Sequence, residues 1–136
     1  MKSLQKEQVS MMLSNIFLIL PALTAALYQQ WLYCFFATGI FIFSPIFHWY
    51  RLIDRKSKQF TIFKILDWSF AVSAFLYMYY YIYIYATNYK ITLFTLLTLV
   101  VLFFWYGWKR ASYEKLHPLF HIIAPIVSTA ILLVVN

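Results

Sequence analysis

The sequence predicts an all-α integral membrane protein built as a bundle of five transmembrane helices. Hydrophobic residues make up 64% of its 136 positions, well above the roughly 45 to 50% of an ordinary soluble domain. Charged residues make up 11%, and most of them lie in short breaks between long apolar runs. These observations exclude a water-soluble fold and a disordered chain, and they indicate a single membrane domain over residues 1–136.

Five predominantly apolar runs are long enough to cross a bilayer, whose hydrocarbon core of about 30 Å requires roughly 20 helical residues. We expect helices over approximately residues 9–28, 31–50, 60–86, 91–108 and 116–135. In the third run Tyr and Ile alternate from Tyr79 to Tyr85, a pattern that is also typical of a β-strand. An open strand cannot satisfy its backbone hydrogen bonds in lipid, so we interpret this segment as a tyrosine-rich helix end at the headgroup region.

The cations indicate how the helices are oriented. If the N-terminus is cytoplasmic, the opposite side holds only Lys90, and Lys64 can reach the cytoplasmic surface from within its helix. The other cations then all lie on the cytoplasmic side: Lys2, Lys6, Arg51, Arg55, Lys56, Lys58, Lys109, Arg110 and Lys115. We therefore predict a multi-pass protein, of the inner membrane if bacterial, with a cytoplasmic N-terminus and the C-terminus outside.

The net charge of +7 is therefore explained by the cations that flank the membrane helices. We expect no nucleic-acid partner. Cys34 is the single cysteine, so an internal disulfide or a cysteine-based zinc finger is excluded.

Four ionisable residues within the expected helices need a partner or a function, because charged groups are costly in a membrane. They are His48, Asp67, His117 and His121. At about 1.5 Å per residue, His48 lies roughly 5 Å from Arg51, and Asp67 and His121 lie roughly 10 Å from the cytoplasmic ends of their helices. This shared depth predicts one site in the cytoplasmic leaflet.

The spacing of the histidines is typical of a metal site. His117 and His121 are four residues apart, so both rings project from one helical face and can hold one ion, and His48 can supply a third ligand. Three imidazoles leave a tetrahedral zinc ion (Zn²⁺) with one position for water, as in catalytic sites. Asp67 is then a candidate general base, and the Ser44 hydroxyl a candidate donor to a developing oxyanion.

These residues resemble the CREST superfamily of integral membrane hydrolases, which includes alkaline ceramidases, adiponectin and progestin receptors, GPI-remodelling lipases and myomaker. The shared pattern is Ser44 and His48 on the second helix, Asp67 on the third, and His117 and His121 on the last. The resemblance implies that the histidines bind zinc, that Ser44 and Asp67 lie beside it, and that the substrate is a membrane lipid. It implies hydrolysis of a lipid amide or ester, as in a ceramidase or a phospholipase.

The chain departs from this family in length, since the family normally has seven helices. Five helices keep the same parity, so the last helix still runs from inside to outside. A homo-oligomer is one way to restore the lipid cavity that seven helices enclose.

Other interpretations remain open at this stage. The zinc site can be purely structural, in a receptor-like or fusion-related membrane protein without enzymatic activity. A haem-binding cytochrome is a weaker alternative, because histidines four apart on one helix cannot reach opposite faces of one haem. Asp67 can pair with Lys64 instead of serving the site, and the Ser44 hydroxyl can donate a hydrogen bond to a backbone carbonyl of its own helix.

Finally, we expect Pro118 in the first turn of the last helix, where proline is tolerated.

Overall fold

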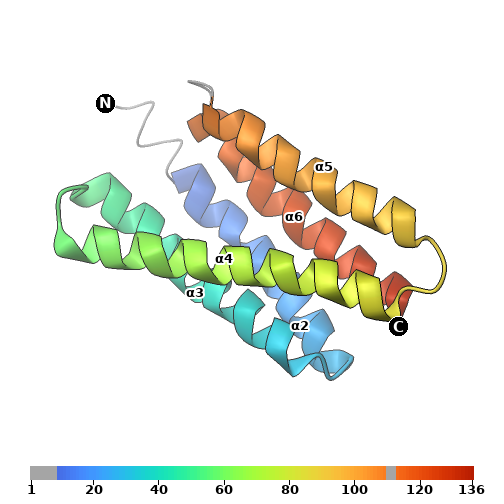
Figure 1. Cartoon of the computed structure of the whole chain (residues 1–136). Helices are drawn as coiled ribbons and strands as arrows, with labels where there is room; N and C mark the ends of the chain where they lie inside the picture. Colours follow the sequence, from blue (N-terminus) through green and yellow to red (C-terminus); the bar gives the residue numbers. More distant parts are fainter. Residues whose placement is uncertain (1–8, 110–112) are drawn as a thin grey trace.

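The computed structural model describes residues 9–109 and 113–136 of the chain, and nearly all of these residues are helical (Figure 1). Five helical segments among them are long and apolar enough to cross a membrane: Val9–Leu27, Trp31–Ile53, Lys58–Tyr85, Lys90–Trp108 and Lys115–Val135. The predicted all-α fold with five helices long and apolar enough to span a membrane is confirmed for the described residues. Lys2, Lys6 and Arg110 lie outside the described residues, and the cytoplasmic location of the N-terminus remains a prediction.

The helices begin and end close to the expected positions. The first span continues through a short 3-10 helix, η1 (Asn15–Leu18), into α2 (Ile19–Leu27). It is followed by α3 (Trp31–Ile53), α4 (Lys58–Tyr85), α5 (Lys90–Lys109) and α6 (Tyr113–Val135). The alternating Tyr and Ile residues are helical, as predicted.

Local chemistry explains several of these boundaries. Ser57 caps α4, because its side chain accepts a hydrogen bond of 3.1 Å from the Phe60 amide. Gln29 adopts a positive φ of 58° in the turn between α2 and α3, which reverses the chain within three residues. The 3-10 stretch η1 ends three residues before Pro21, which has no amide hydrogen to donate to the Phe17 carbonyl.

One local expectation is wrong. Pro118 lies in the interior of α6, as Pro125 does, and not in its first turn. The reason is that α6 begins at Tyr113, three residues earlier than the apolar run suggested, because the polar residues before that run are helical as well.

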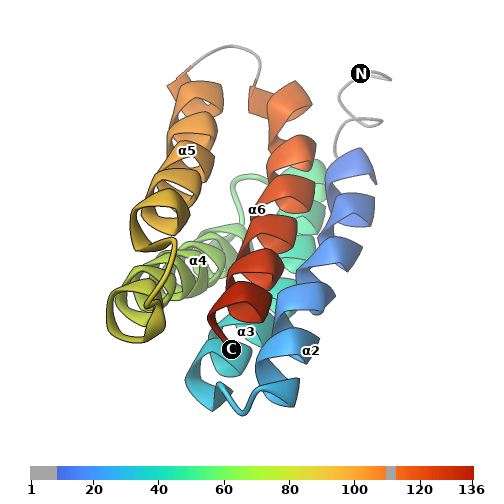
Figure 2. The same cartoon turned by 90° about the vertical axis from the view of Figure 1, so that its right-hand side faces the viewer.

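Figure 2 shows how the helices are arranged around one another. The first span packs against both α3 and α6, α4 packs along α3, and α5 packs against α6, with fewer contacts between α4 and α5 or α6. The most densely packed part of the core contains large side chains from the second half of α4, such as Met78, Tyr81 and Ile82, together with Leu97 and Ile131.

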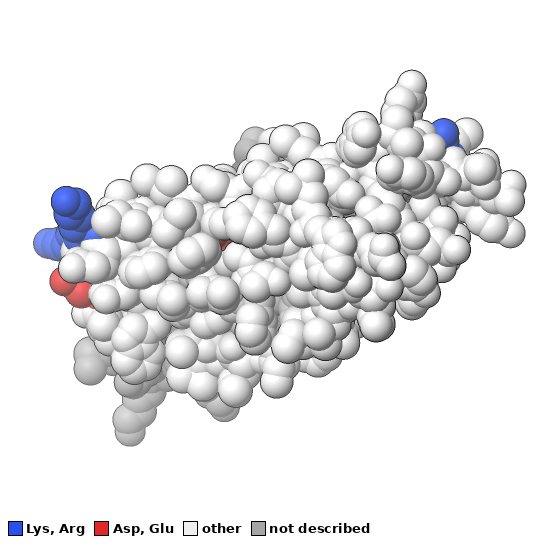
Figure 3. Space-filling view, turned by 90° about the horizontal axis from the view of Figure 1, so that it is seen from below, with Lys and Arg blue, Asp and Glu red and all other residues white. Residues whose placement is uncertain are grey.

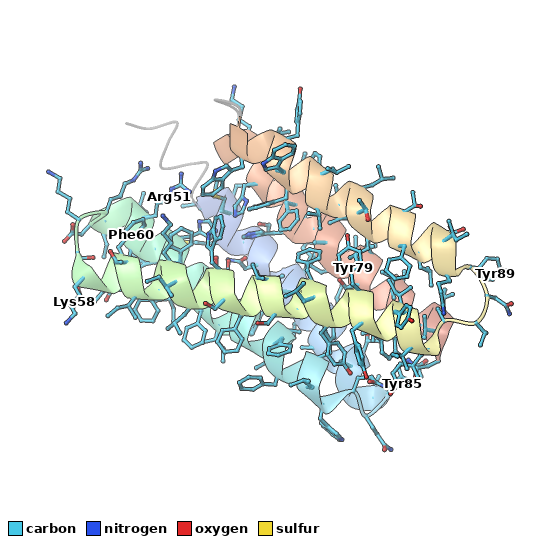
Figure 4. The ribbon with its side chains drawn as sticks, viewed as in Figure 1. Arg51, Lys58, Phe60, Tyr79, Tyr85 and Tyr89 are labelled. Carbon is cyan, nitrogen blue, oxygen red and sulfur yellow. The ribbon has the colours of Figure 1, made fainter. Side chains whose placement is uncertain are left out.

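The two ends of the bundle differ in charge. Basic residues gather around the α3–α4 turn, at one end of the face that Figure 3 shows, and we call this the basic end; it includes Arg51, Arg55, Lys56 and Lys58. The opposite end, which we call the tyrosine end, carries the α4–α5 turn with Tyr85, Tyr89 and Lys90 (Figure 4). The surface between them is predominantly apolar, as a lipid-facing surface must be.

Close packing of α3 on α4 depends on Gly39. A Cβ atom at this position would overlap the ring of Phe70 on α4. That ring is held between Phe35 and Phe43, each with its centroid 5.4 Å away. The Phe70 ring therefore has little room to move aside.

We expect Gly39→Ala to lower the melting temperature of the protein in detergent micelles by several degrees. Overpacking typically costs about 1–3 kcal/mol, more than the roughly 0.5–1 kcal/mol that alanine gains over glycine in a helix. Gly107→Ala is the matched control, because the nearest atom to its added Cβ is 3.4 Å away on Leu116. Equal melting temperatures for the two variants would contradict the tight contact.

Candidate metal centre

Three buried histidines meet inside the bundle, one from α3 and two from α6. His48, His117 and His121 are 0%, 7% and 5% exposed. Their ring centroids are 5.2 Å (His48–His117), 5.3 Å (His48–His121) and 4.4 Å (His117–His121) apart. Each ring offers one nitrogen such that all three nitrogens lie within 4.8 Å of one another. The predicted convergence is confirmed, and the three residues lie close enough to hold a metal ion.

The backbone places these rings in a gap between two helices. Among the described residues, no Cα atom of α3 lies within 8 Å of a Cα atom of α6, whereas η1 and α2 contact both helices. The first span therefore holds α3 and α6 at a fixed separation, and the imidazoles extend into the remaining space. His117 and His121 share one face of α6 because they are one helical turn apart.

Three ring nitrogens of His48 and His121 have no hydrogen-bond partner among the described residues. Nδ1 and Nε2 of His48 and Nδ1 of His121 are buried without a hydrogen bond to any described residue. Buried polar atoms of this kind cost free energy unless they are paired, and a metal ion would pair them. The backbone of Met11 lies close to the His121 ring, so a residue of the first span helps to orient this imidazole.

Zinc fits this donor set. Ligand nitrogens in a tetrahedral zinc site lie roughly 3.3 Å apart, given bonds of about 2.0–2.1 Å. The separations here, up to 4.8 Å, call for a modest inward shift of the rings. Haem fits less well, because imidazoles in mutual contact leave no room for a macrocycle between them.

A cavity of about 380 Å³ opens beside the histidines and contains the other two predicted site residues. His117, His121, Ser44 and Asp67 line it at one end, and the remainder of its wall is mainly apolar and aromatic. Ser44 is 1% exposed and lies one turn from His48 toward the tyrosine end. The structure thus places four of the five predicted residues on the wall of one cavity, and the fifth, His48, contacts the rings of His117 and His121.

Asp67 lies beside Ser44 and forms no ion pair with Lys64 among the described residues. Ser44 and Asp67 line the same cavity and are close enough to influence each other, but the Ser44 Oγ atom makes no hydrogen bond to a described residue. Lys64 lines a separate, shallower hollow on the surface. The alternative of an ion pair between Lys64 and Asp67 is therefore not favoured by the structure.

Two buried residues of the first span, Met11 and Asn15, were not predicted from the sequence. Met11 is completely buried, and its backbone contact with His121 has no sequence signal. Asn15 is 1% exposed, and neither Nδ2 nor Oδ1 of its side chain has a hydrogen-bond partner among the described residues. A lone asparagine inside an apolar run is a signal that could have identified it.

The chain matches no family model, no curated protein and no solved structure. Its likeness to the CREST superfamily consequently rests on Ser44, His48, Asp67, His117 and His121. Inference about function starts from the geometry of these residues.

We expect the purified protein to bind about one zinc ion per chain, measured by mass spectrometry of the metal after exposure to zinc and removal of the excess. His48→Ala and His121→Ala should each lower this content severalfold, because two imidazoles remain in place of three. Cys34→Ser is the control: it removes another potential ligand, but from a position roughly 21 Å along α3 from His48. Full metal content in both histidine variants would contradict the assigned ligands.

Proposed function

We propose that the protein is a zinc-dependent intramembrane hydrolase that cleaves an amide or ester bond of a membrane lipid. One observation carries this proposal: three convergent imidazoles adjoin an apolar cavity that also contains a carboxyl group and a hydroxyl group. Among the described residues, the cluster of possible metal ligands consists of these three histidines. Three protein ligands are typical of catalytic zinc, whereas structural zinc usually has four.

The membrane location supports a lipid substrate. The cavity lies between spans that are long and apolar enough to cross a bilayer, and its volume of about 380 Å³ is within the range of small-molecule sites. Its apolar wall suits an acyl chain, and its polar end suits the bond that joins the chain to the rest of the lipid. Under the predicted orientation, this polar end faces the cytoplasmic leaflet.

The proposed chemistry needs a metal ion and two side chains beside it. Zinc held by His48, His117 and His121 would supply a Lewis acid for activating water and polarising a carbonyl group. Asp67 accepts the proton of the attacking water, and the Ser44 hydroxyl donates a hydrogen bond to the carbonyl oxygen as negative charge develops on it. As the new C–O bond forms and the amide or ester bond breaks, Asp67 passes its proton to the leaving amine or alcohol. The products are a fatty acid and the remainder of the lipid.

The order of residues along the helices agrees with these roles. His48 and Ser44 are one turn apart on α3, with Ser44 on the side of the apolar cavity. Asp67 comes from α4 and faces the same end of the cavity. Ser44, His48, Asp67, His117 and His121 resemble the sequence pattern of the CREST superfamily, and we propose that the chain is a short member of it.

A structural zinc site is the second candidate. It is favoured by the gap between α3 and α6, which zinc would bridge whether or not a reaction takes place. The two functions differ in what Asp67 does, since a structural site requires no proton acceptor.

We expect metal-loaded wild-type protein in vesicles to release fatty acid from a fluorescent ceramide or a fluorescent phospholipid. Asp67→Asn should retain zinc and lower turnover by a factor of about 10²–10⁴, which is the usual contribution of a general acid–base residue. His121→Ala should lose both zinc and turnover. Chromatographic analysis of the released fatty acid and metal analysis of the same samples measure both effects.

The matched control is Asp54→Asn, which makes the same substitution in the exposed α3–α4 turn. It should retain both zinc and turnover. Zinc-loaded wild-type protein that hydrolyses neither lipid would overturn the proposed activity and favour the structural site. Turnover that is unchanged in Asp67→Asn would refute the role of that carboxylate.

A further inference from the structure

The helices α4 and α5 are joined closely at one end of the bundle and separate toward the other. Figures 1 and 2 both show them adjacent at the α4–α5 turn and diverging toward the basic end. Near the turn, Tyr79 packs on Phe94 with centroids 5.7 Å apart, and its hydroxyl group lies 3.0 Å from that of Thr98 (Figure 4). Nearer the basic end, the contact is made by the rings of Trp68 and Trp108, 4.9 Å apart.

Between these two contacts the cavity reaches the lipid-facing surface. Val72 and Leu76 of α4 line the cavity, yet they are 52% and 64% exposed. Val101 and Phe104 line it from the side of α5. The stretch of α4 from Trp68 to Tyr79 is roughly 16 Å long. An apolar opening of this length faces the region that the bilayer occupies.

The side chain of Lys64 lies beside this opening. Lys64 lines a hollow together with Trp68, Ser69 and Trp108, and Trp68 lines the main cavity as well. Lys64 is exposed and has no acidic partner within the described part of the chain. It lies about 4 Å nearer the basic end than Asp67 along α4. A charged group at Lys64 would therefore lie closer to the membrane surface than the proposed reaction centre.

We propose that the substrate is an anionic, phosphate-bearing lipid that enters sideways from the bilayer between α4 and α5. This inference rests on the proposed hydrolase function and names its substrate class. The phosphate binds at Lys64 with the Ser69 hydroxyl as a second donor, and the acyl chain passes the Trp68–Trp108 pair into the cavity.

The order of groups along such a lipid matches the order of groups along α4. In a phosphate-bearing lipid the phosphate lies on the water side, the first ester or amide bond lies a few bonds deeper, and the acyl chain is deepest. Along α4, Lys64 is followed by Asp67 and then by Val72 and Leu76, which border the opening. A lysine near the membrane surface favours an anionic lipid by about 1 kcal/mol, whereas a neutral lipid gains nothing from it.

Photo-crosslinking can test the proposal without requiring turnover. The metal-loaded protein in phosphatidylcholine vesicles is labelled with a trace of diazirine phosphatidic acid or with diazirine diacylglycerol of the same chains. Mass spectrometry then locates the label. We expect labels on α4 and α5 at the opening, and about fivefold more labelling by the anionic probe.

Two sets of variants test the charge of Lys64 and the opening between α4 and α5 independently. Lys64→Gln should reduce the preference for phosphatidic acid to about one, while Lys64→Arg and the control Lys58→Gln, at the start of α4, should preserve it. Val72→Trp should obstruct the opening and lower labelling by both probes severalfold. Ile62→Trp, which adds the same side chain at another exposed position of α4 that lines neither hollow, should not.

Several outcomes would overturn this inference. They are equal labelling of the wild-type protein by the two probes, a preference that survives in Lys64→Gln, and labels located away from α4 and α5. Ready disulfide formation between copies of a Val72→Cys, Cys34→Ser variant would also do so, because a second chain would then cover the opening. The expected labelling without lipid hydrolysis would support phosphate binding at Lys64 and lipid entry between α4 and α5 but contradict the hydrolase. Hydrolysis without a charge preference would support the hydrolase and contradict the phosphate-bearing substrate.

Discussion

A hydrocarbon environment offers no water to polar groups, and this constraint shapes the whole molecule. Backbone groups must be paired within helices, and polar side chains inside the membrane must face one another or a cavity. The three histidines obey this requirement: they are at most 7% exposed, while leucine, isoleucine and aromatic side chains cover the outside. Burial of the imidazoles removes their nitrogens from water, so these polar atoms need a partner inside the protein. A metal ion meets that requirement with the fewest additional groups.

The first span explains why a cavity exists beside these histidines. It packs against both α3 and α6, so these two helices do not approach each other directly. Pro21 belongs to this arrangement, because the 3-10 turn before it places Asn15 and Leu18 on the buried side. A bundle in which α3 and α6 packed tightly would bury the same histidines without leaving space for a ligand. Spacing between helices is therefore as important to the proposed chemistry as the identity of the ligands.

The long helix α4 connects the site to the membrane. One of its faces packs on α3 through Gly39 and Phe70, while its other side separates from α5. The proposed hydrolase would need its polar centre shielded from lipid, although its substrate would reside in the lipid. An opening bordered by apolar and aromatic residues, such as Val72 and Trp68, reconciles these needs, because an acyl chain can pass it more easily than a charged headgroup can. The five helices thus border a cavity without a second chain.

The sequence by itself determined the fold class, the five spans and the grouping of His48, His117 and His121, because hydrophobic length, helical periodicity and depth are local properties that residue order encodes directly. It identified Ser44 and Asp67 by the same reasoning together with a family resemblance. The tertiary structure decided which way the rings face, the contact between Met11 and His121, the burial of Asn15, and the separation of α4 from α5. These features depend on how each helix is rotated and spaced relative to its neighbours, and that results from packing between residues far apart in the chain.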